Sequence, residues 1–390
     1  MPDQRLTRPR LVPTDHAFGR RRFLWVGAGF AVALAAPWTR ALAQGTGPAA
    51  PGASPSAARV PPGQLWLLTA PDHWDPAVLQ SLAAEQGVDV RITPLTDDAA
   101  AFAAVRSGSV EADIVSGDGL WIPAYHAAGL TEAIDLDQIP VAQELYADAR
   151  TMELLQTPDG MLGYPWSWSP LQIVYDPARV ASAPDSWDVL VDAANRGRVV
   201  IEGQRMDLVL CAGRAIGARD PLDMTDAELA AATEWLTRLK PNIRRITRQR
   251  GDTVAALASG ECSMGISSLG APDLVKDAGG PEMVAFVPKE GTIGSIEAEM
   301  VRANAPNAVR VPAYLDAAAS AEASAAAFLH DGRPLFNERA YRILVDAGHG
   351  ARADRYLYDR PEVALEMTLT GPGARPEAYL AAADVVFADQ

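Results

Sequence analysis

The chain has 390 residues, of which 48% are hydrophobic and 21% charged, and its formal net charge is -15. A chain of this length and composition is expected to be globular and to form two domains. The acidic excess argues against nucleic acids and anionic membrane surfaces as partners, because both repel a negatively charged protein.

The first 43 residues have the three parts of a secretory signal. Arginines at 20–22 precede an apolar run at 25–36, and small residues at 41–43 offer a cleavage site. The run is shorter than the roughly 20 residues that span a bilayer, so we expect cleavage before Gln44 and a protein released into the periplasm.

The same segment resembles a twin-arginine export signal, because Arg20 and Arg21 are followed by one residue and then by Phe-Leu. Gly19 and Trp25 replace the hydroxyl residue and the lysine usual in that signal. We expect the twin-arginine machinery as an export partner, with the general secretory route as the alternative. Removing 1–43 takes away seven arginines and two acidic residues, which changes the formal net charge to -20.

The elements expected after a flexible tether at 44–63 alternate strands with helices, which favours βαβ units around a mostly parallel sheet. Expected strands lie at 65–68, 88–92, 112–115, 198–201 and 262–267. Expected helices begin at Asp75-Pro76 and otherwise cover about 97–106, 206–216, 225–239, 312–329 and 338–347, with a helical end to the tail at 361–388.

Motifs for catalysis are missing: the sequence has no G-x-S-x-G, no H-E-x-x-H, no P-loop and no glycine-rich dinucleotide fingerprint. We therefore expect no enzyme activity, no cofactor and no metal. Cys211 and Cys262 are expected to be buried thiols or to form one disulfide. An exported enzyme stays open as an alternative, because twin-arginine export often carries folded cofactor proteins.

Four tryptophans lie where strands or loops give way to other elements: Trp74, Trp121, Trp166 and Trp168. Ligands of open α/β sheets bind beyond the carboxyl ends of strands. An indole face beside carboxylates attracts an organic cation by about 0.5–2 kcal/mol. For each ring, contact with a ligand and packing in the core both stay open.

From about residue 65 onward the chain resembles the periplasmic solute-binding proteins of ABC importers, in their spermidine/putrescine-binding branch. The stretches that carry the resemblance are, in chain order, Ala112-Asp113-Ile114-Val115, Pro165-Trp166-Ser167-Trp168, Asp185-Ser186-Trp187 with Gly197-Arg198-Val199, Gly260-Glu261, Pro288-Lys289-Glu290-Gly291 and Ala303-Asn304-Ala305-Pro306-Asn307. Each stretch is weak alone, and their shared order makes the resemblance specific.

The resemblance implies an α/β fold of two lobes (type II), joined by two crossover segments with the ligand cleft between them. It places 64–165 and 296–390 in the first lobe and 166–295 in the second. Such proteins bind a small solute as monomers, close over it by hinge motion and deliver it to the subunits of a membrane permease.

The ligand-binding candidates are Trp74, Asp118, Trp121, Trp166, Trp168, Asp207, Glu297 and His349. The resemblance implies that Asp207 and Glu297 bind ammonium groups and that the tryptophans cover methylenes. Asp207 equally suits a first-turn helix acid and Asp118 an N-cap, while Glu299 is expected to be solvated.

Two tryptophans of that branch are missing. Ser295 stands two residues before Glu297, where the branch has the first tryptophan, and Ser267-Ser268 stand on the second-lobe strand that often has the other. The sequence thus predicts a cationic solute of polyamine type, putrescine or spermidine. A thiamine-like, choline-like or amino-acid-like ligand stays open.

Overall fold

The structure is a computed structural model that describes residues 63–69, 87–95, 98–180, 182–371 and 374–388. All of these belong to one compact unit, residues 58–390. The expected signal peptide, nearly all of the tether, the helix at Asp75-Pro76 and Trp74 lie outside the described residues. None of the described helices is long and apolar enough to cross a membrane.

The first sheet has seven strands, and its main path runs β14-β13-β3-β1-β2. Strands β1, β2 and β3 are parallel, whereas β13 runs antiparallel to β3 and also pairs with β4 and β7. The bounds are β1 Gln64–Thr69, β2 Asp89–Pro94, β3 Ile114–Asp118, β4 Thr131–Glu132, β7 Tyr164–Pro170, β13 Ile293–Arg302 and β14 Thr368–Leu369. The three strands expected here are confirmed, with β3 reaching three residues further than its apolar run.

Helices accompany the first sheet at α3 Asp98–Ser107, α4 Trp121–Ala127, α5 Ala147–Arg150, α10 Val311–Ala318, α11 Ala321–Asp331, α12 Glu338–Asp346, α13 Gly350–Arg355 and α14 Glu362–Glu366. The single helix expected at 312–329 is two helices, α10 and α11. The chain leaves helical geometry at Ser320, whose side chain caps α11 by accepting from the backbone N–H of Ala323.

The second sheet has five strands in the order β10-β9-β11-β8-β12. Strands β9, β10 and β11 are parallel, and β8 is antiparallel to β11 and β12. The bounds are β8 Gln172–Tyr175, β9 Val199–Glu202, β10 Ile243–Thr247, β11 Met264–Ser267 and β12 Val284–Phe286, with helices α6 Arg205–Ala215, α7 Asp226–Leu239, α8 Arg250–Ala258 and α9 Ala271–Asp277. Helix α7 begins at the expected Thr225, which forms a capping box with Glu228.

Short elements complete the described fold. Strands β5 Gln156–Thr157 and β6 Gly160–Met161 form a hairpin, and short 3₁₀ helices lie at Leu136–Gln138, Pro140–Glu144, Glu153–Leu155, Trp187–Val191, Ala193–Asn195, Lys240–Asn242 and Ala308–Arg310.

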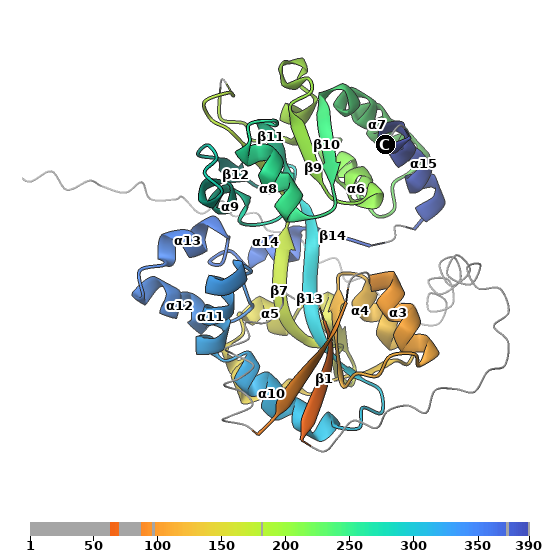
Figure 1. Ribbon diagram of the computed structural model, residues 1–390. Helices are drawn as coiled ribbons and strands as arrows, with labels where there is room; N and C mark the ends of the chain where they lie inside the picture. Colours follow the sequence, from red (N-terminus) through yellow and green to blue (C-terminus); the bar gives the residue numbers. More distant parts are fainter. Residues whose placement is uncertain (1–62, 70–86, 96–97, 181, 372–373, 389–390) are drawn as a thin grey trace, which may run out of the picture. The chain divides into compact units, whose positions relative to one another are not determined.

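Two neighbouring strands carry the chain from one sheet to the other. Strand β7 leads within two residues into β8, and β13 brings the chain back to the first sheet, where it pairs with β7 (Figure 1). A third passage leads from β14 to helix α15, Pro376–Phe387.

Helix α15 packs with α6 and α7 of the second sheet. The Tyr379 hydroxyl donates to the Pro221 carbonyl and accepts from the Met224 N–H, at 2.9 and 2.8 Å. Tyr379 and Ala383 are buried in the same core as Trp187. The expectation that all of 296–390 belongs with the first sheet is therefore corrected for this helix.

Both cysteines are buried free thiols, in separate core clusters on the two faces of the second sheet. Of the two alternatives left open by the sequence, the structure thus shows the unbonded one.

Candidate functional site

A cavity of about 280 Å³ lies where segments of the two sheets meet. Its described lining residues are Ser169, Ser295, Glu297, Gly332 and Arg333 from β7, β13 and the end of α11, and Arg250, Ser268 and Leu269 from the second sheet and its helices. Since both positive and negative side chains line it, we call it the mixed-charge cavity.

Strand alternation decides which side chains of β7 reach this cavity. Successive residues of a strand point to opposite faces. Ser167 and Ser169 therefore share one face, where Ser169 lines the cavity and Ser167 binds Glu297. Trp168 points to the opposite face, and Trp166 lies at an irregularity in the pairing of β7 with β13; the two residues are only 0% and 2% exposed.

Glu297, on β13, is the central carboxylate of the cavity. One Arg333 nitrogen, Nη1, donates to both of its oxygens at 2.9 and 2.8 Å. The Ser167 hydroxyl donates to Oε2 at 2.5 Å. Both charged side chains are about one-fifth exposed, so their attraction is screened less than that of a surface pair. Glu297 is thus held in place by a cation that the protein itself supplies.

A second carboxylate, Asp118, lies beside Glu297. The two residues are direct partners across the antiparallel pair of β3 and β13. Oδ1 of Asp118 is buried and has no hydrogen-bond partner within the described chain. Burial, followed by repulsion from Glu297, holds the pKa of Asp118 well above its usual value.

Asp118 does not cap a helix, which corrects one of its two expected roles. It is the last residue of β3, and α4 begins three residues later, after Leu120, without a side-chain cap. The other expected role, contact with a ligand, stays a prediction; Asp118 lies beside Glu297.

A third carboxylate, Glu202, lies behind the cavity on the second sheet. It ends β9, and the hydroxyls of Ser267 and Ser268 each donate to one of its oxygens at 2.6 Å. Arg250 lies at the start of α8 and donates to the carbonyl of Leu269, which also lines the cavity. This region is the carboxyl end of parallel strands, where α/β sheets bind ligands.

Three carboxyl groups (Asp118, Glu202 and Glu297) and two guanidinium groups (Arg250 and Arg333) lie in or next to the cavity within the described chain. Only Glu297, Arg250 and Arg333 line it, and the raised pKa of Asp118 favours its neutral form. A cation in contact with Asp118 would favour the ionised form, which would set three carboxylates against two guanidinium groups. The carboxylate and hydroxyl oxygens can accept hydrogen bonds from an ammonium group that contacts both sheets.

The contact between the two sheets continues next to the cavity. Asp273 of α9 accepts from Arg355 of α13, with Nη2 at 3.0 and 3.1 Å from its two oxygens. Leu269 is buried in the cluster formed by α11, α12 and α13. These contacts hold the second-sheet wall of the cavity against the helices of the first.

Trp166 and Trp168 do not line the cavity, which corrects the expectation that they cover methylenes of the ligand. The ring of Trp168 packs against Phe336 and Tyr358, with centroids 4.6 and 6.0 Å apart. Trp166 is buried, and its carbonyl accepts from the N–H of Phe336. Both rings are core residues of the first sheet.

The remaining candidates are spread over the chain. Asp207 is the N3 residue of α6, and its Oδ2 accepts from the Gln204 N–H in a capping box, which is the helix role that the sequence left open. Burial raises its pKa. Trp121 begins α4 and packs on Phe102 at 5.6 Å. His349 is exposed at the N-cap of α13, and it is not among the residues that line the cavity.

Glu299 is not solvated, contrary to expectation. It is 0% exposed, and the Ser116 hydroxyl lies 3.0 and 3.1 Å from its two oxygens. Burial raises the pKa of Glu299 to about 8. A buried acid that stays protonated below that pH is a core group and not a free charge.

Sequence reasoning missed Arg333, Arg250, Glu202, Ser169 and Ser268. For Ser169 a signal existed, because Trp-Ser-Trp-Ser alternates with the period of a strand. Glu202 directly follows the expected strand at 198–201, which marks a carboxyl end. Arg333 had no signal, since its pairing with Glu297 joins residues 36 positions apart.

Three comparisons place the chain among known proteins. Residues 77–343 match the sequence profile of the family described as bacterial extracellular solute-binding protein. A protein named putrescine/agmatine-binding protein, from Pseudomonas aeruginosa, is 25% identical over 264 residues, which are 63% of this chain and 68% of that protein.

Solved structures show the same fold. The spermidine/putrescine ABC transporter substrate-binding protein PotD of Streptococcus pneumoniae gives a TM-score of 0.71 at 16% identity, covering 84% of this chain and 98% of that one. The Tp0655 lipoprotein (TpPotD) of Treponema pallidum gives 0.70 at 18% identity, covering 83% and 99%. The expected two-lobed α/β fold is thereby confirmed.

Proposed function

Because the chain belongs to the family of bacterial extracellular solute-binding proteins, we propose that it is the solute-binding component of an ABC importer whose ligand is a small amine of the polyamine type. The observation that carries the ligand class is the pair of carboxylates Asp118 and Glu297 on one side of the cavity, with Glu202 on the other. One ammonium group would bind at each side, and the methylenes would lie between them.

The relative from Pseudomonas aeruginosa supports this ligand class, since its name gives putrescine and agmatine as ligands. Both are chains of methylenes with a cationic group at each end. The name of the Streptococcus pneumoniae protein likewise gives spermidine and putrescine as the solutes of its ABC transporter.

Delivery to a permease follows from contact with both sheets. A ligand shifts a hinge equilibrium only by the difference in its affinity for the two states. A diamine held by Glu297 and by Glu202 would favour the state in which the cavity has both walls. The permease would then recognise that state, and no chemical step is needed.

The test is a thermal-shift panel on the purified protein, followed by isothermal titration calorimetry. We expect putrescine, spermidine or agmatine to raise the melting temperature, since a ligand at 100 times its Kd adds about 2.7 kcal/mol of stability. Choline, thiamine and neutral amino acids serve as comparison ligands. If no diamine or polyamine at millimolar concentration raises the melting temperature, the proposed ligand class fails while the family stands.

A matched pair of variants tests the site within that panel. Glu202→Gln should weaken diamine binding more than binding of a monoamine of equal length, because only the diamine reaches both walls. Glu234→Gln is the control, since Glu234 is exposed on α7 and does not line the cavity. Equal losses for diamine and monoamine would remove Glu202 from the site.

A second candidate is a ligand with both an amine and a carboxylate, which Arg250 and Arg333 favour because both line the cavity. An ω-amino acid such as 4-aminobutyrate belongs in the panel for this reason. Tighter binding of that compound than of putrescine would select this candidate.

The family functions outside the cytoplasm. We further propose that the protein reaches the periplasm through the twin-arginine machinery and works there as a monomer. Replacing Arg20 and Arg21 by lysine should leave unprocessed precursor in the cytoplasm. Normal export of that variant would indicate the general secretory route.

A further inference from the structure

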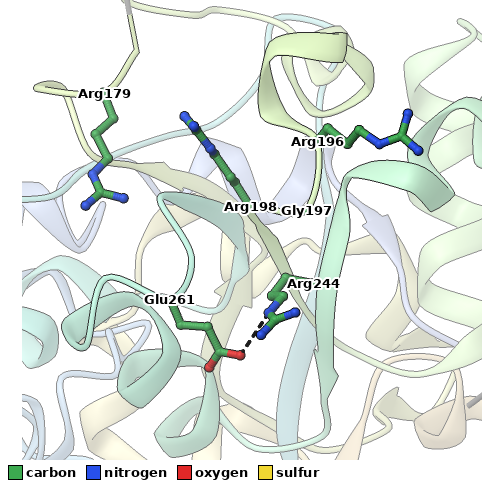
Figure 2. A pocket seen from close by; sticks show the side chains of 6 residues that line it. All are labelled: Arg179, Arg196, Gly197, Arg198, Arg244 and Glu261. Carbon is green, nitrogen blue, oxygen red and sulfur yellow. Dashed lines mark hydrogen bonds and ion pairs between the residues drawn. The ribbon is translucent and has the colours of Figure 1, made fainter.

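A larger cavity, of about 570 Å³, lies away from the mixed-charge cavity. Its described lining residues are Arg179, Arg196, Gly197, Arg198, Arg244 and Glu261, and we call it the arginine pocket (Figure 2). Four arginines and one glutamate thus line it, and of these four arginines only Arg244 is hydrogen-bonded to Glu261. In a chain whose formal net charge is -15, such a concentration of positive charge does not follow from composition.

The arginine pocket lies at the opposite end of the second sheet from Glu202. Arg198 directly precedes β9, Arg244 is the second residue of β10, and Glu261 precedes β11 by three residues. These three strands are parallel, so their amino ends lie at one edge. Arg179 follows β8, which runs the other way and ends at the same edge. The pocket is therefore separate from the proposed amine site.

The surrounding sequence adds to this charge. Between residues 238 and 250 the chain has six arginines or lysines and no acidic residue. Strand β10 lies at the edge of its sheet. Charged residues on an edge strand also prevent pairing with another sheet. That role accounts for Arg244 and Arg245 but not for Arg179, Arg196 and Arg198, which lie outside the strands.

Two of the arginines are oriented by acidic neighbours. Arg244 Nε donates to Glu261 at 3.2 Å, and Arg245 lies 3.1 Å from the other oxygen of Glu261. A register irregularity in β10 between residues 243 and 245 lets these consecutive side chains reach one carboxylate. Arg179 Nε lies 3.5 Å from Asp176. Both Arg179 and Arg244 are thus held through Nε, which leaves their terminal nitrogens for another acceptor.

The side chains of Arg196 and Arg198 have no hydrogen bond or ion pair within the described chain. Their backbone is fixed, because the Arg198 N–H donates to the Asn195 and Asn242 carbonyls and the Arg198 carbonyl accepts from Ser263. The backbone is therefore fixed here, and both exposed guanidinium groups can turn toward an anion without giving up a contact within the described chain. The charge of Glu261, in contrast, is already satisfied by two arginines.

We propose that the arginine pocket binds a multivalent oxyanion of phosphate chemistry, either a free phosphate compound or the headgroup of an anionic phospholipid. Guanidinium groups match phosphate oxygens with paired hydrogen bonds, and such charged bonds are the stronger ones. The guanidinium groups are spread around the pocket and do not meet at one point (Figure 2). A single carboxylate reaches one of them, whereas a compound with two or more phosphate charges reaches several.

The volume and lining agree with that class. Small-molecule pockets measure about 300–1,000 Å³, and they are usually apolar. This pocket has the size but a charged lining, so its ligand is a polar anion. The site is independent of the amine cavity, and its test does not depend on the proposed function.

The test titrates pyrophosphate and inorganic phosphate into the full chain by calorimetry at low and at 0.15 M salt. We expect pyrophosphate to bind with a submillimolar Kd, more tightly than phosphate and more weakly at the higher salt. Arg196→Gln combined with Arg198→Gln should raise the pyrophosphate Kd about tenfold, since two guanidinium groups are lost. These side chains have no described partners, so the fold should be retained.

The control is Arg106→Gln, which removes one positive charge from an exposed position on α3, compared with two in the double variant. Cosedimentation with phosphatidylglycerol vesicles, compared with phosphatidylcholine vesicles, shows whether the ligand is a lipid. Binding to phosphatidylglycerol vesicles that the double variant loses indicates a lipid headgroup. Tight pyrophosphate binding without vesicle binding indicates a free phosphate compound. No binding in either assay overturns the proposal. If Arg106→Gln weakens pyrophosphate binding as much as the double variant does, the proposal is also overturned. The bound anion is then an adventitious ion only.

Discussion

The two cavities at the ends of the second sheet differ in how their charges are balanced. In the mixed-charge cavity, Glu297 is paired with Arg333 and Glu202 is held by two serines. In the arginine pocket, Glu261 is satisfied by Arg244 and Arg245, and the guanidinium groups of Arg196 and Arg198 stay unpaired. One cavity supplies its own counter-ion, and the other leaves cationic charge for an outside partner.

This difference predicts that the two cavities differ in how strictly they select their ligands. A ligand that binds in the mixed-charge cavity must either displace Arg333 from Glu297 or bind Glu297 together with it. Such a ligand needs a cationic group that can donate to the Glu297 oxygens. An anion that enters the arginine pocket meets charge that is exposed and already available. We therefore expect the first site to be selective and the second to depend mainly on charge and salt.

The largest expected effect comes from Glu297→Gln. This change removes the carboxylate that Arg333 and Ser167 hold for the ligand. Losing one partner of a partly buried charge pair costs about 2 kcal/mol or more, so the amine Kd should rise at least about 30-fold. Calorimetry with the tightest amine of the panel measures it.

The same variant separates the two cavities. Pyrophosphate binding by Glu297→Gln should match that of the unchanged protein. A Glu297→Gln protein that also carries Arg333→Gln controls for the stranded guanidinium group. Unchanged amine affinity in both would show that Glu297 does not contact the ligand.

The second effect is a gain. Arg333→Gln removes the internal cation and makes the amine cavity resemble the arginine pocket, with unpaired charge ready for a ligand. A hydrogen bond to a charged group contributes about 1.5–3 kcal/mol. In this variant the ligand no longer has to break the Arg333–Glu297 bonds, so part of that free energy adds to its binding. We expect the amine Kd to fall about tenfold.

Arg333→Lys serves as the matched control, because it keeps the charge and should keep the affinity near that of the unchanged protein. Weaker amine binding by Arg333→Gln would contradict the comparison. In that case Arg333 would act on the ligand directly, as expected for a ligand that carries its own carboxylate.

How much of this was readable from the sequence differs between the fold and the site. Strands and helices followed from local patterns: the Thr225 cap and the apolar run at 65–68 depend on residues close in sequence. The crossing of β7 into the second sheet followed from the resemblance. Helix α15 did not, because only tertiary packing decides that Tyr379 meets Pro221 and not the first sheet.

For the cavity, the sequence predicted only a residue that the resemblance itself identifies. Glu297 was found because a carboxylate at that position belongs to the resemblance. The tryptophans were misread, since the alternation in Trp166-Ser167-Trp168-Ser169 puts the rings in the core and the hydroxyls at the cavity. Arg333 could not be found, because the α11 helix that presents it reaches Glu297 only in the folded chain.

A third, smaller effect is a dependence of amine binding on pH that Asp118 should cause. Burial and the neighbouring Glu297 raise the pKa of Asp118, so Asp118 is protonated over a wider range than an exposed aspartate. A cation favours the ionised form, so binding should release a proton and the amine Kd should fall as pH rises. Calorimetry from pH 5.5 to 9, in two buffers of different ionisation enthalpy, measures both.

Asp118→Asn should flatten this profile, while pyrophosphate binding should show no dependence that Asp118→Asn removes. Amine affinity that falls as pH rises toward 9 would contradict the sign. An equal slope in Asp118→Asn would assign the titration to another group.

The smallest expected effect tests whether an exposed ion pair between the two walls contributes little to amine affinity. Asp273 and Arg355 join the two walls beside the amine cavity, but the Arg355 side chain is 54% exposed, like the arginines of the other pocket. Exposed pairs contribute about 0.2–1 kcal/mol. Asp273→Asn should therefore raise the amine Kd only two- to threefold, by weakening the state with both walls in place. Glu261→Gln, which removes a half-buried acid from the far end of the same sheet, is the control and should leave the amine Kd unchanged. A loss in Asp273→Asn as large as that in Glu297→Gln would mean that closure, and not the carboxylates, determines affinity.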